Sequence, residues 1–579
     1  MPKRTFIHWR QPAIPAVLDF ACAAYERNGL VDLSRVIIVT PGARAGRRFL
    51  ELLAEKTDGR NIAPQLATPG DLPERLYQLK RPLADELTQQ FAWVEALRGL
   101  PEQQIRCIVG DPPADGDIPA WLAIGDMLAR LHRELSADLK RFSHVAALPL
   151  IHAARETARW QALAAAQERY LGLLDQLELW DRQTARIVAI EKEEPATDCD
   201  IFLIGLADMN GTLRAMLQQV ADRVHVFIHA PEELAPRFDE FGVLKAETWE
   251  HAPIPLEDDW LRFADRPADQ ADSTVDFVRE QADAGAAVED VVIGLADESL
   301  ASPVRVALED RGVKTRWIGG RTAGMTSIAR LLEAVAKRLD SDFTAESCEL
   351  LRHPDVSNWI SRQDVPENWL ALVDEAVIRH APRKLGGGLG DNAALNTSKK
   401  IADLLDRLLS PLAGTKPIAD WARPVCTLLQ EVYGEHLFTD AEADQQERQA
   451  LEKIRTTLEG QAEVPESLAP STTAAAAIRL AIGLVSSEVL TPESPIDAVE
   501  MIGWLELPLD DAPFLVVCGL NDGFVPSSLN NDKFLPNTLR EHLGLEDNHR
   551  RYARDAYAMC VLTNSRQRIR FIAGRHDQL

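Results

Sequence analysis

Arginines gather in two short stretches of the sequence, and the chemistry they favour is the binding of phosphate. The first stretch holds Arg35, Arg44, Arg47 and Arg48, and the second holds Arg540, Arg550, Arg551, Arg554, Arg566, Arg568, Arg570 and Arg575. The chain has a formal net charge of −26, which argues against a surface coated by nucleic acid throughout. A locally positive channel remains compatible with that charge, because salt confines exposed charges to about 8–10 Å. Solvated helix faces are the alternative interpretation of both stretches.

Other residue types predict no catalytic or metal site. The seven cysteines are scattered singly, and the thirteen histidines form neither an HExxH pattern nor a cluster with cysteine. The glycine-rich segment 385–390 follows no predicted strand and lacks the Gly-Lys-Ser/Thr of a phosphate-binding loop. We therefore predict a loop there, no catalytic residue and no bound metal.

The elements that must position the arginines alternate between apolar runs and helical segments. Runs 36–40, 201–205, 224–228, 291–295 and 514–520 are typical of strands buried on both faces, and most lead into segments with helical periodicity. Two long tracts between them, about 80–190 and 342–485, repeat apolar residues at helical spacing.

This order predicts an α/β fold with two RecA-like domains of the P-loop-NTPase type, each with an inserted helical subdomain. We assign 1–80 and 191–250 to the first RecA-like domain and 81–190 to its helical insertion. Segments 255–340 and 486–579 form the second RecA-like domain, and 341–485 is its insertion. A chain of 579 residues and 64.2 kDa has room for several such cores. It contains no apolar run of membrane-spanning length, so we expect a cytoplasmic protein without membrane contact.

Segment 503–526 carries the most specific motif. It combines Gly503 and Glu506, the apolar run 514–518 and the turn Asn521-Asp522-Gly523. This resembles helicase motif V as found in AddB/RecC-type subunits of bacterial helicase-nucleases, with Asp522 in place of the usual glutamate. Segments 535–545 and 550–560 follow in family order. Segment 561–566 then stands where motif VI falls.

Three weaker likenesses occur in the same order as in that family. Segment 36–49, with Thr40, Arg44, Arg47 and Arg48, resembles motif Ia, which in helicases meets single-stranded DNA. Segment 265–311 resembles the opening of the second RecA-like domain, and 350–354 resembles the start of its helical insertion. The resemblance thus implies that a DNA strand runs over the α/β domains and meets Thr40, Arg44, Arg47 and Arg48. The local excess of positive charge adds Arg550, Arg551 and Arg554 to the predicted path.

The parts of an ATP site that the resemblance locates are degenerate. Segment 6–15, where a Walker A loop is expected, has no glycine and no Gly-Lys-Ser/Thr. Gly205 to Asp208 replaces the acidic pair that holds magnesium, and we interpret Asp208 as a turn or cap residue. At motif VI, Asn564 stands at the arginine-finger position, two residues before Arg566. We therefore expect no ATPase activity.

The resemblance also implies partners and missing parts. Family members bind single-stranded DNA or duplex ends and pair with an AddA/RecB-like motor subunit. They usually continue into a PD-(D/E)xK nuclease domain, which holds magnesium and most ligands of an iron–sulfur cluster. No motif of that domain precedes residue 579, so we expect either a fragment, which we favour, or a naturally nuclease-free form, in both cases without cofactor or nuclease activity. The full-length family protein would be an exonuclease subunit.

Two other functions compete with this one. An active ATP-dependent DNA helicase would bind nucleotide as an isolated chain. An acidic protein-interaction scaffold would use the same fold without DNA contact, and its positive charge would be dispersed rather than lining one groove.

Overall fold

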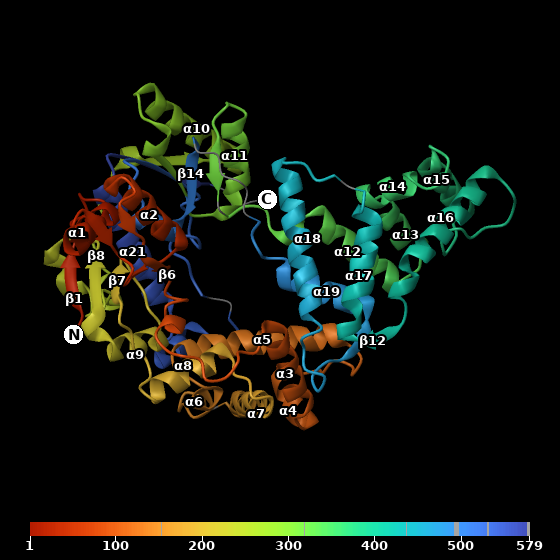
Figure 1. Cartoon of the computed structure of the whole chain (residues 1–579), viewed down its shortest axis with the longest axis horizontal. Helices are drawn as coiled ribbons and strands as arrows, with labels where there is room; N and C mark the ends of the chain where they lie inside the picture. Colours follow the sequence, from red (N-terminus) through yellow and green to blue (C-terminus); the bar gives the residue numbers. More distant parts are fainter. Residues whose placement is uncertain (152, 318, 436, 491–496, 530–531, 576–579) are drawn as a thin grey trace.

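The computed structural model describes residues 1–151, 153–317, 319–435, 437–490, 497–529 and 532–575. Parts of the expected segment 486–579, namely 491–496, 530–531 and 576–579, lie outside the described residues. Two α/β modules and two helical regions surround a central opening (Figure 1). Among the described helices, none combines the length and the apolar character needed to cross a bilayer.

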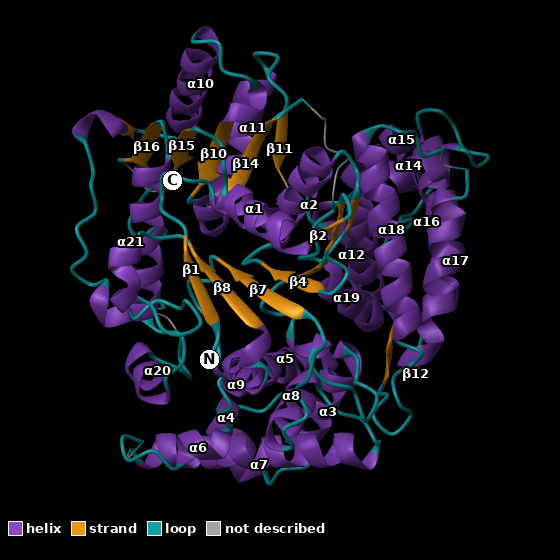
Figure 2. Ribbon diagram, turned by 60° about the vertical axis from the view of Figure 1, so that its left-hand side comes forward, coloured by secondary structure: helices purple, strands orange, loops and turns teal. Residues whose placement is uncertain are grey.

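The first module is built on a five-stranded parallel sheet. Its strand order is β1 (Lys3–Phe6), β8 (Val224–Ile228), β7 (Asp200–Ile204), β4 (Val36–Val39) and β6 (Gln65–Ala67). Helices α1 (Ala13–Tyr25) and α2 (Ala43–Thr57) cover one face, and α9 (Gly211–Gln219) covers the other (Figure 2). The expected strands 36–40 and 201–205 pair directly, with Ile37 opposite Ile201. All four residues of β4 are buried because helices cover both faces, as in most parallel sheets.

The second module is built on a six-stranded parallel sheet. Its order is β11 (Thr315–Trp317), β14 (Val499–Gly503), β10 (Val291–Leu295), β15 (Phe514–Cys518), β16 (Arg568–Gly574) and β9 (Leu261–Ala264). Side chains alternate along β10: Val291 and Ile293 pack with α10 (Pro267–Asp283) and α11 (Ala301–Glu309), whereas Val292 packs on the opposite face. Helices on both faces make this a doubly wound sheet.

Helix α21 (Asn548–Ser565) belongs to both modules. Tyr557 and Val561 enter the apolar core on one face of the first sheet, with Ala553 and Cys560. Met559 and Leu562 enter the core of the second sheet, with Ala558. Expected as part of the second domain alone, this helix joins the two modules along their length.

The two helical tracts also share one apolar core. The first runs from α3 (Glu86–Arg98) through α5 (Ile118–Ala137) and α7 (Ala154–Gln176) to α8 (Arg182–Glu191). The second runs from α12 (Ser327–Asp340) through α16 (Ala393–Leu409), α17 (Ala422–Tyr433) and α18 (Glu442–Gly460) to α19 (Ala474–Val485). A single cluster of buried residues extends through both tracts, except α8, and through α20 (Asn537–Leu543). Ala189 of α8 packs instead in the core of the first sheet. The expected insertions therefore do not pack as separate units. Segment 385–390 is a loop, as predicted.

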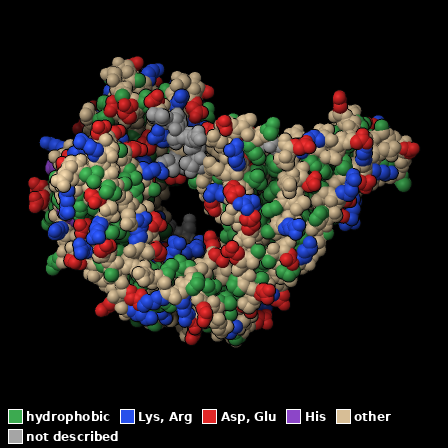
Figure 3. Space-filling view, in the orientation of Figure 1, with side chains coloured by type: hydrophobic (Ala, Val, Ile, Leu, Met, Phe, Trp, Pro, Cys, Tyr) green, Lys and Arg blue, Asp and Glu red, His purple; other side chains and the backbone are tan. Residues whose placement is uncertain are grey.

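The opening at the centre persists when side chains are drawn (Figure 3). The first α/β module lies on its left, the second above it, the first helical region below and the second helical region on the right (Figure 1). Lysine and arginine side chains gather at its lower margin, while its right wall mixes both charges (Figure 3).

Candidate functional site

A buried ionic network joins the carboxyl end of the first sheet to the second module. Arg44, at the start of α2, donates to both carboxylate oxygens of Glu500 at 2.9 and 2.6 Å and to Asp510 at 2.6 Å. Arg566 donates to the other oxygen of Asp510 at 3.0 Å. Burial alone would raise the pKa of Asp510, but the guanidinium groups of Arg566 and Arg44 hold it below its ordinary value. Two predicted site residues, Arg44 and Arg566, thus meet on one carboxylate.

Arg44 is only 7% exposed, so its guanidinium faces carboxylates of the second module and not solvent. The Glu506 carboxylate lies against the backbone at Gly42, just before α2. In this arrangement Arg44 stabilises the joint between modules, and the predicted phosphate contact stays a prediction.

Two further arginines form ion pairs across the same joint between the modules. Arg48 pairs with Asp511 at 2.9 Å. Arg550 pairs with Asp208 and also donates to the carbonyl of Met209 at 3.1 Å. Asp208 also accepts from the backbone N–H of Met209 at 2.9 Å. It lies in the loop before α9, whose N-cap is Asn210.

The loop between β1 and α1 is the segment where a Walker A loop is expected. It packs against His229, which directly follows β8. Trp9 Nε1 donates to the His229 carbonyl at 2.7 Å. The His229 ring nitrogens lie 3.2 Å from the carbonyl oxygen of Pro508 and 3.1 Å from that of Gln11. Burial lowers the pKa of His229 to about 4, although both carbonyls favour its protonated form.

These residues do not fit a magnesium-bound nucleotide. A phosphate cradle needs backbone N–H groups turned toward it, whereas the Gln11 carbonyl faces this site. A magnesium ion needs free carboxylate oxygens, whereas Asp208 is paired with Arg550.

The remaining predicted residues do not form one patch. Thr40 is buried and donates to the carbonyl of Gly42 at 2.8 Å. Arg47 is exposed on α2. Arg551 and Arg554 pair with Glu546 at 3.1 and 3.2 Å.

The motif residues of the second module hold its backbone in place. The Asn521 amide donates to the carbonyl of Gly574 at 2.7 Å and accepts from its N–H at 3.0 Å, which fixes the turn after β15 to the end of β16. Asp522 is exposed in that turn, and Gly523 has a positive φ of 88°. Gly205, at the end of β7, also has a positive φ. Asn564 is exposed and donates one turn back along α21, to the carbonyl of Cys560 at 2.8 Å.

A cavity of about 450 Å³ opens at the carboxyl ends of β10 and β14, where parallel sheets place ligands. Arg554, Glu506, Trp317 and Phe524 line it. Arg554 is the one predicted DNA-contacting residue that lines a described cavity.

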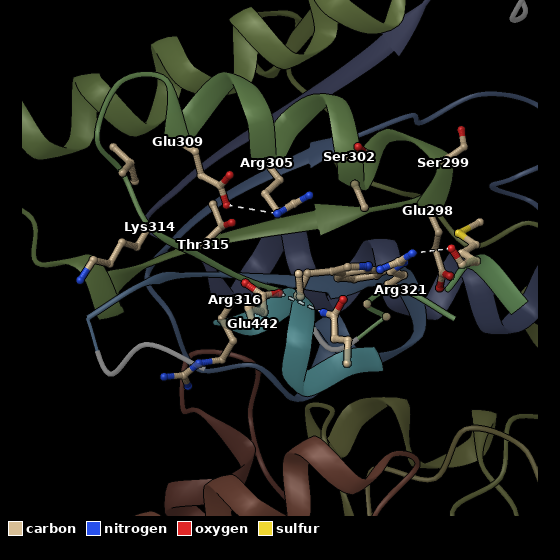
Figure 4. A pocket seen from close by; sticks show the side chains of 18 of the residues that line it. Glu298, Ser299, Ser302, Arg305, Glu309, Lys314, Thr315, Arg316, Arg321 and Glu442 are labelled. Atoms are coloured by element: carbon tan, nitrogen blue, oxygen red, sulfur yellow. Dashed lines mark hydrogen bonds and ion pairs between the residues drawn. The ribbon is translucent and has the colours of Figure 1, made fainter. Parts of the chain in front are cut away.

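A larger cleft of about 1140 Å³ adjoins that cavity, and Glu298, Trp317 and Gly319 line both. Its walls come from α11, β11, α12 and α18 (Figure 4). Five cations line it: Arg305, Lys314, Arg316, Arg321 and Arg330. None of the five was predicted as a site residue, although basic residues are dense between 305 and 330.

The comparisons add no relative. Neither a scan against protein-family models nor a search of curated proteins found a match for this chain.

Proposed function

We propose that this chain is a DNA-binding, helicase-like but non-motor subunit of an AddB/RecC-type helicase-nuclease, acting on double-strand-break ends. Its two doubly wound parallel modules then correspond to two RecA-like domains, and its helical regions to their insertions. The motif order from 36–49 to 561–566 supports this assignment.

The observation that carries the proposal is the filled joint between the modules. Motors of this plan bind ATP between two RecA-like domains and change that interface during turnover. Here Arg44, Asp510 and Arg566 form a buried ion network across the joint. His229 and the shared helix α21 close it further. A joint held closed by such contacts fits a subunit that guides DNA without changing its own conformation. The partner motor then moves the DNA.

The test combines ATP hydrolysis with DNA binding by the purified chain. We expect no DNA-stimulated phosphate release, and binding of labelled single-stranded DNA that weakens as salt rises. Phosphate release abolished by Asp208→Asn, at the position where an active motor holds magnesium, would favour the active-helicase alternative. Absence of DNA binding at low salt would favour the interaction scaffold.

Partner choice is tested with a purified AddA/RecB-type motor. We expect a heterodimer in size-exclusion chromatography, and motor activity on duplex ends that increases when this chain is present. Two proteins that elute separately at micromolar concentration would contradict this part of the proposal.

A further inference from the structure

The cations of the large cleft stand in sharp contrast to the rest of this acidic chain. Five cations and three carboxylates, Glu298, Glu309 and Glu442, line the cleft. The next described cavity, of about 710 Å³, carries only Arg338 against Asp340, Asp342 and Asp406. The net charge of the chain is −26, so a positive excess in its largest described cleft selects for an anionic ligand.

Part of that positive charge is available to a ligand. Glu309 pairs with Arg305 at 3.5 Å, and Glu447, outside the cleft lining, pairs with Arg321 at 3.2 Å. Lys314 and Arg330 are exposed, and neither forms an ion pair within the part of the chain that the structure describes.

The cations lie along the cleft and do not converge on one point. Lys314 and Arg316 lie toward one end, Arg305 lies on the upper wall and Arg321 lies toward the other end (Figure 4). A single phosphate group would require convergent donors. Spaced cations match successive phosphates of a chain.

Aromatic side chains continue the same path. Trp317, half-buried, lines both the cleft and the adjoining cavity, where Arg554 and Phe524 follow. Phe524 is 46% exposed, which is a large apolar exposure beside a charged cavity. The adjoining cavity itself is acidic, with Glu298, Glu506 and Asp555 against Arg554, so only the larger cleft supplies an excess of cations. A positive groove with aromatic platforms is the arrangement that binds single-stranded nucleic acid without reading its sequence.

We propose that the cleft and its adjoining cavity form one track for single-stranded DNA. Phosphates bind Lys314, Arg305, Arg321 and Arg330 in the cleft, and bases stack on Trp317 and on Phe524 in the adjoining cavity. This inference rests on the proposed DNA-binding function and gives it a location other than the predicted path over Arg44.

The charge test compares two double variants by fluorescence anisotropy with labelled oligothymidylate over a range of salt. Lys314→Ala with Arg330→Ala should lower the salt slope of binding by about 1.4, since each single-strand phosphate contact contributes about 0.7. The matched control is Lys399→Ala with Arg407→Ala, two exposed cations on α16 at the far end of the second helical region (Figure 1). The control should leave the slope unchanged.

The stacking test uses Phe524→Ala, with Phe263→Ala as the control. Both rings are largely exposed, so neither substitution should disturb folding. Loss of one stacked base should weaken binding about 10-fold, whereas Phe263→Ala, on the edge strand β9, should bind like wild type. Trp317→Phe should retain most of the affinity that Trp317→Ala loses.

The outcomes separate the two proposals. If the wild-type chain binds single-stranded DNA and all cleft variants match their controls, the track is wrong and the proposed function stands. If the wild-type chain binds no DNA at low salt, both fail. Tighter binding of blunt duplex than of the single strand would overturn the single-strand assignment.

Discussion

The buried charged side chains at the joint between the modules stabilise the fold only while all of their partners are present. The side chain of Arg566 is 3% exposed and donates to Asp510 and to the carbonyl of Leu507 at 2.8 Å. Removing it leaves a buried carboxylate with fewer partners, whereas a surface ion pair contributes little because solvent and salt screen it.

We therefore expect Arg566→Ala to lower the free energy of unfolding by about 3–5 kcal/mol. Arg568→Ala, two residues along, removes an exposed pair with Glu280 and should cost less than about 1 kcal/mol. Urea unfolding of both variants measures the difference, and equal effects would contradict the stabilising role of the network.

His229 should make stability depend on pH. Burial lowers its pKa to about 4 in the folded chain, with smaller effects from Arg566 and His8, against an ordinary value of 6.5. The unfolded chain therefore binds a proton at a pH where the folded chain does not. Stability due to this group is complete above pH 6.5 and falls as the pH drops toward 4. Between pH 8 and pH 5 the expected loss is about 2 kcal/mol.

The measurement is urea unfolding of wild type and His229→Gln at both pH values. The variant lacks the titrating ring, so its loss between pH 8 and pH 5 should be smaller by about that amount. Parallel losses in the two proteins would show that other groups cause the acid sensitivity.

Helix α21 has two apolar faces because each module buries one of them. Val561 packs with the first sheet and the adjacent Leu562 with the second. If the helix couples the modules, substitutions on either face should destabilise the same unfolding transition.

Leu562→Ala should cost about 2–5 kcal/mol, and Val561→Ala should shift the same midpoint in the same direction. Asn564→Ala, on the exposed end of the helix, should stay within about 0.5 kcal/mol. Calorimetry is the appropriate measurement, and two separated transitions, each sensitive to one substitution, would show that the modules unfold independently.

Of the strands that the sequence predicted, all except β8, which contains His225, are unbroken apolar runs. Strands β4, β7, β10 and β15 are buried on both faces, so composition alone marks them. Strand β16 was missed because arginines alternate with its apolar residues. One of these, Arg570, reaches Glu280 and lies over the ring of Phe277.

The candidate site was less predictable for a topological reason. Its cations come from α11, the start of β11, the loop after it and α12, which only the folded chain brings around one cleft. Conversely, Arg44 looked like a phosphate ligand because its carboxylate partners lie more than 450 positions away in the sequence.

At the scale of the whole molecule, the opening in Figure 3 suggests that a strand threads through the protein. A threaded strand needs a free end to enter. We therefore expect linear single-stranded DNA to bind more tightly than a covalently closed circle of equal length and sequence.

Competition between the two forms, measured by anisotropy, checks this expectation. Cutting the circle once should restore the affinity of the linear form. Equal affinities would place the strand on the outer surface, where an end gives no advantage.

The shared helix α21 also determines when the first module can complete its apolar core during translation. The ribosome completes the last strand of the first sheet, β8, at residue 228, but Tyr557 and Val561, which cover that module, emerge more than 300 residues later. At about 5–20 residues per second, this interval lasts on the order of 15–60 s. A nascent chain of this protein exposes apolar surface throughout that time, so we expect it to depend on chaperones that hold unfinished chains more than a protein of equal size whose domains close in sequence order.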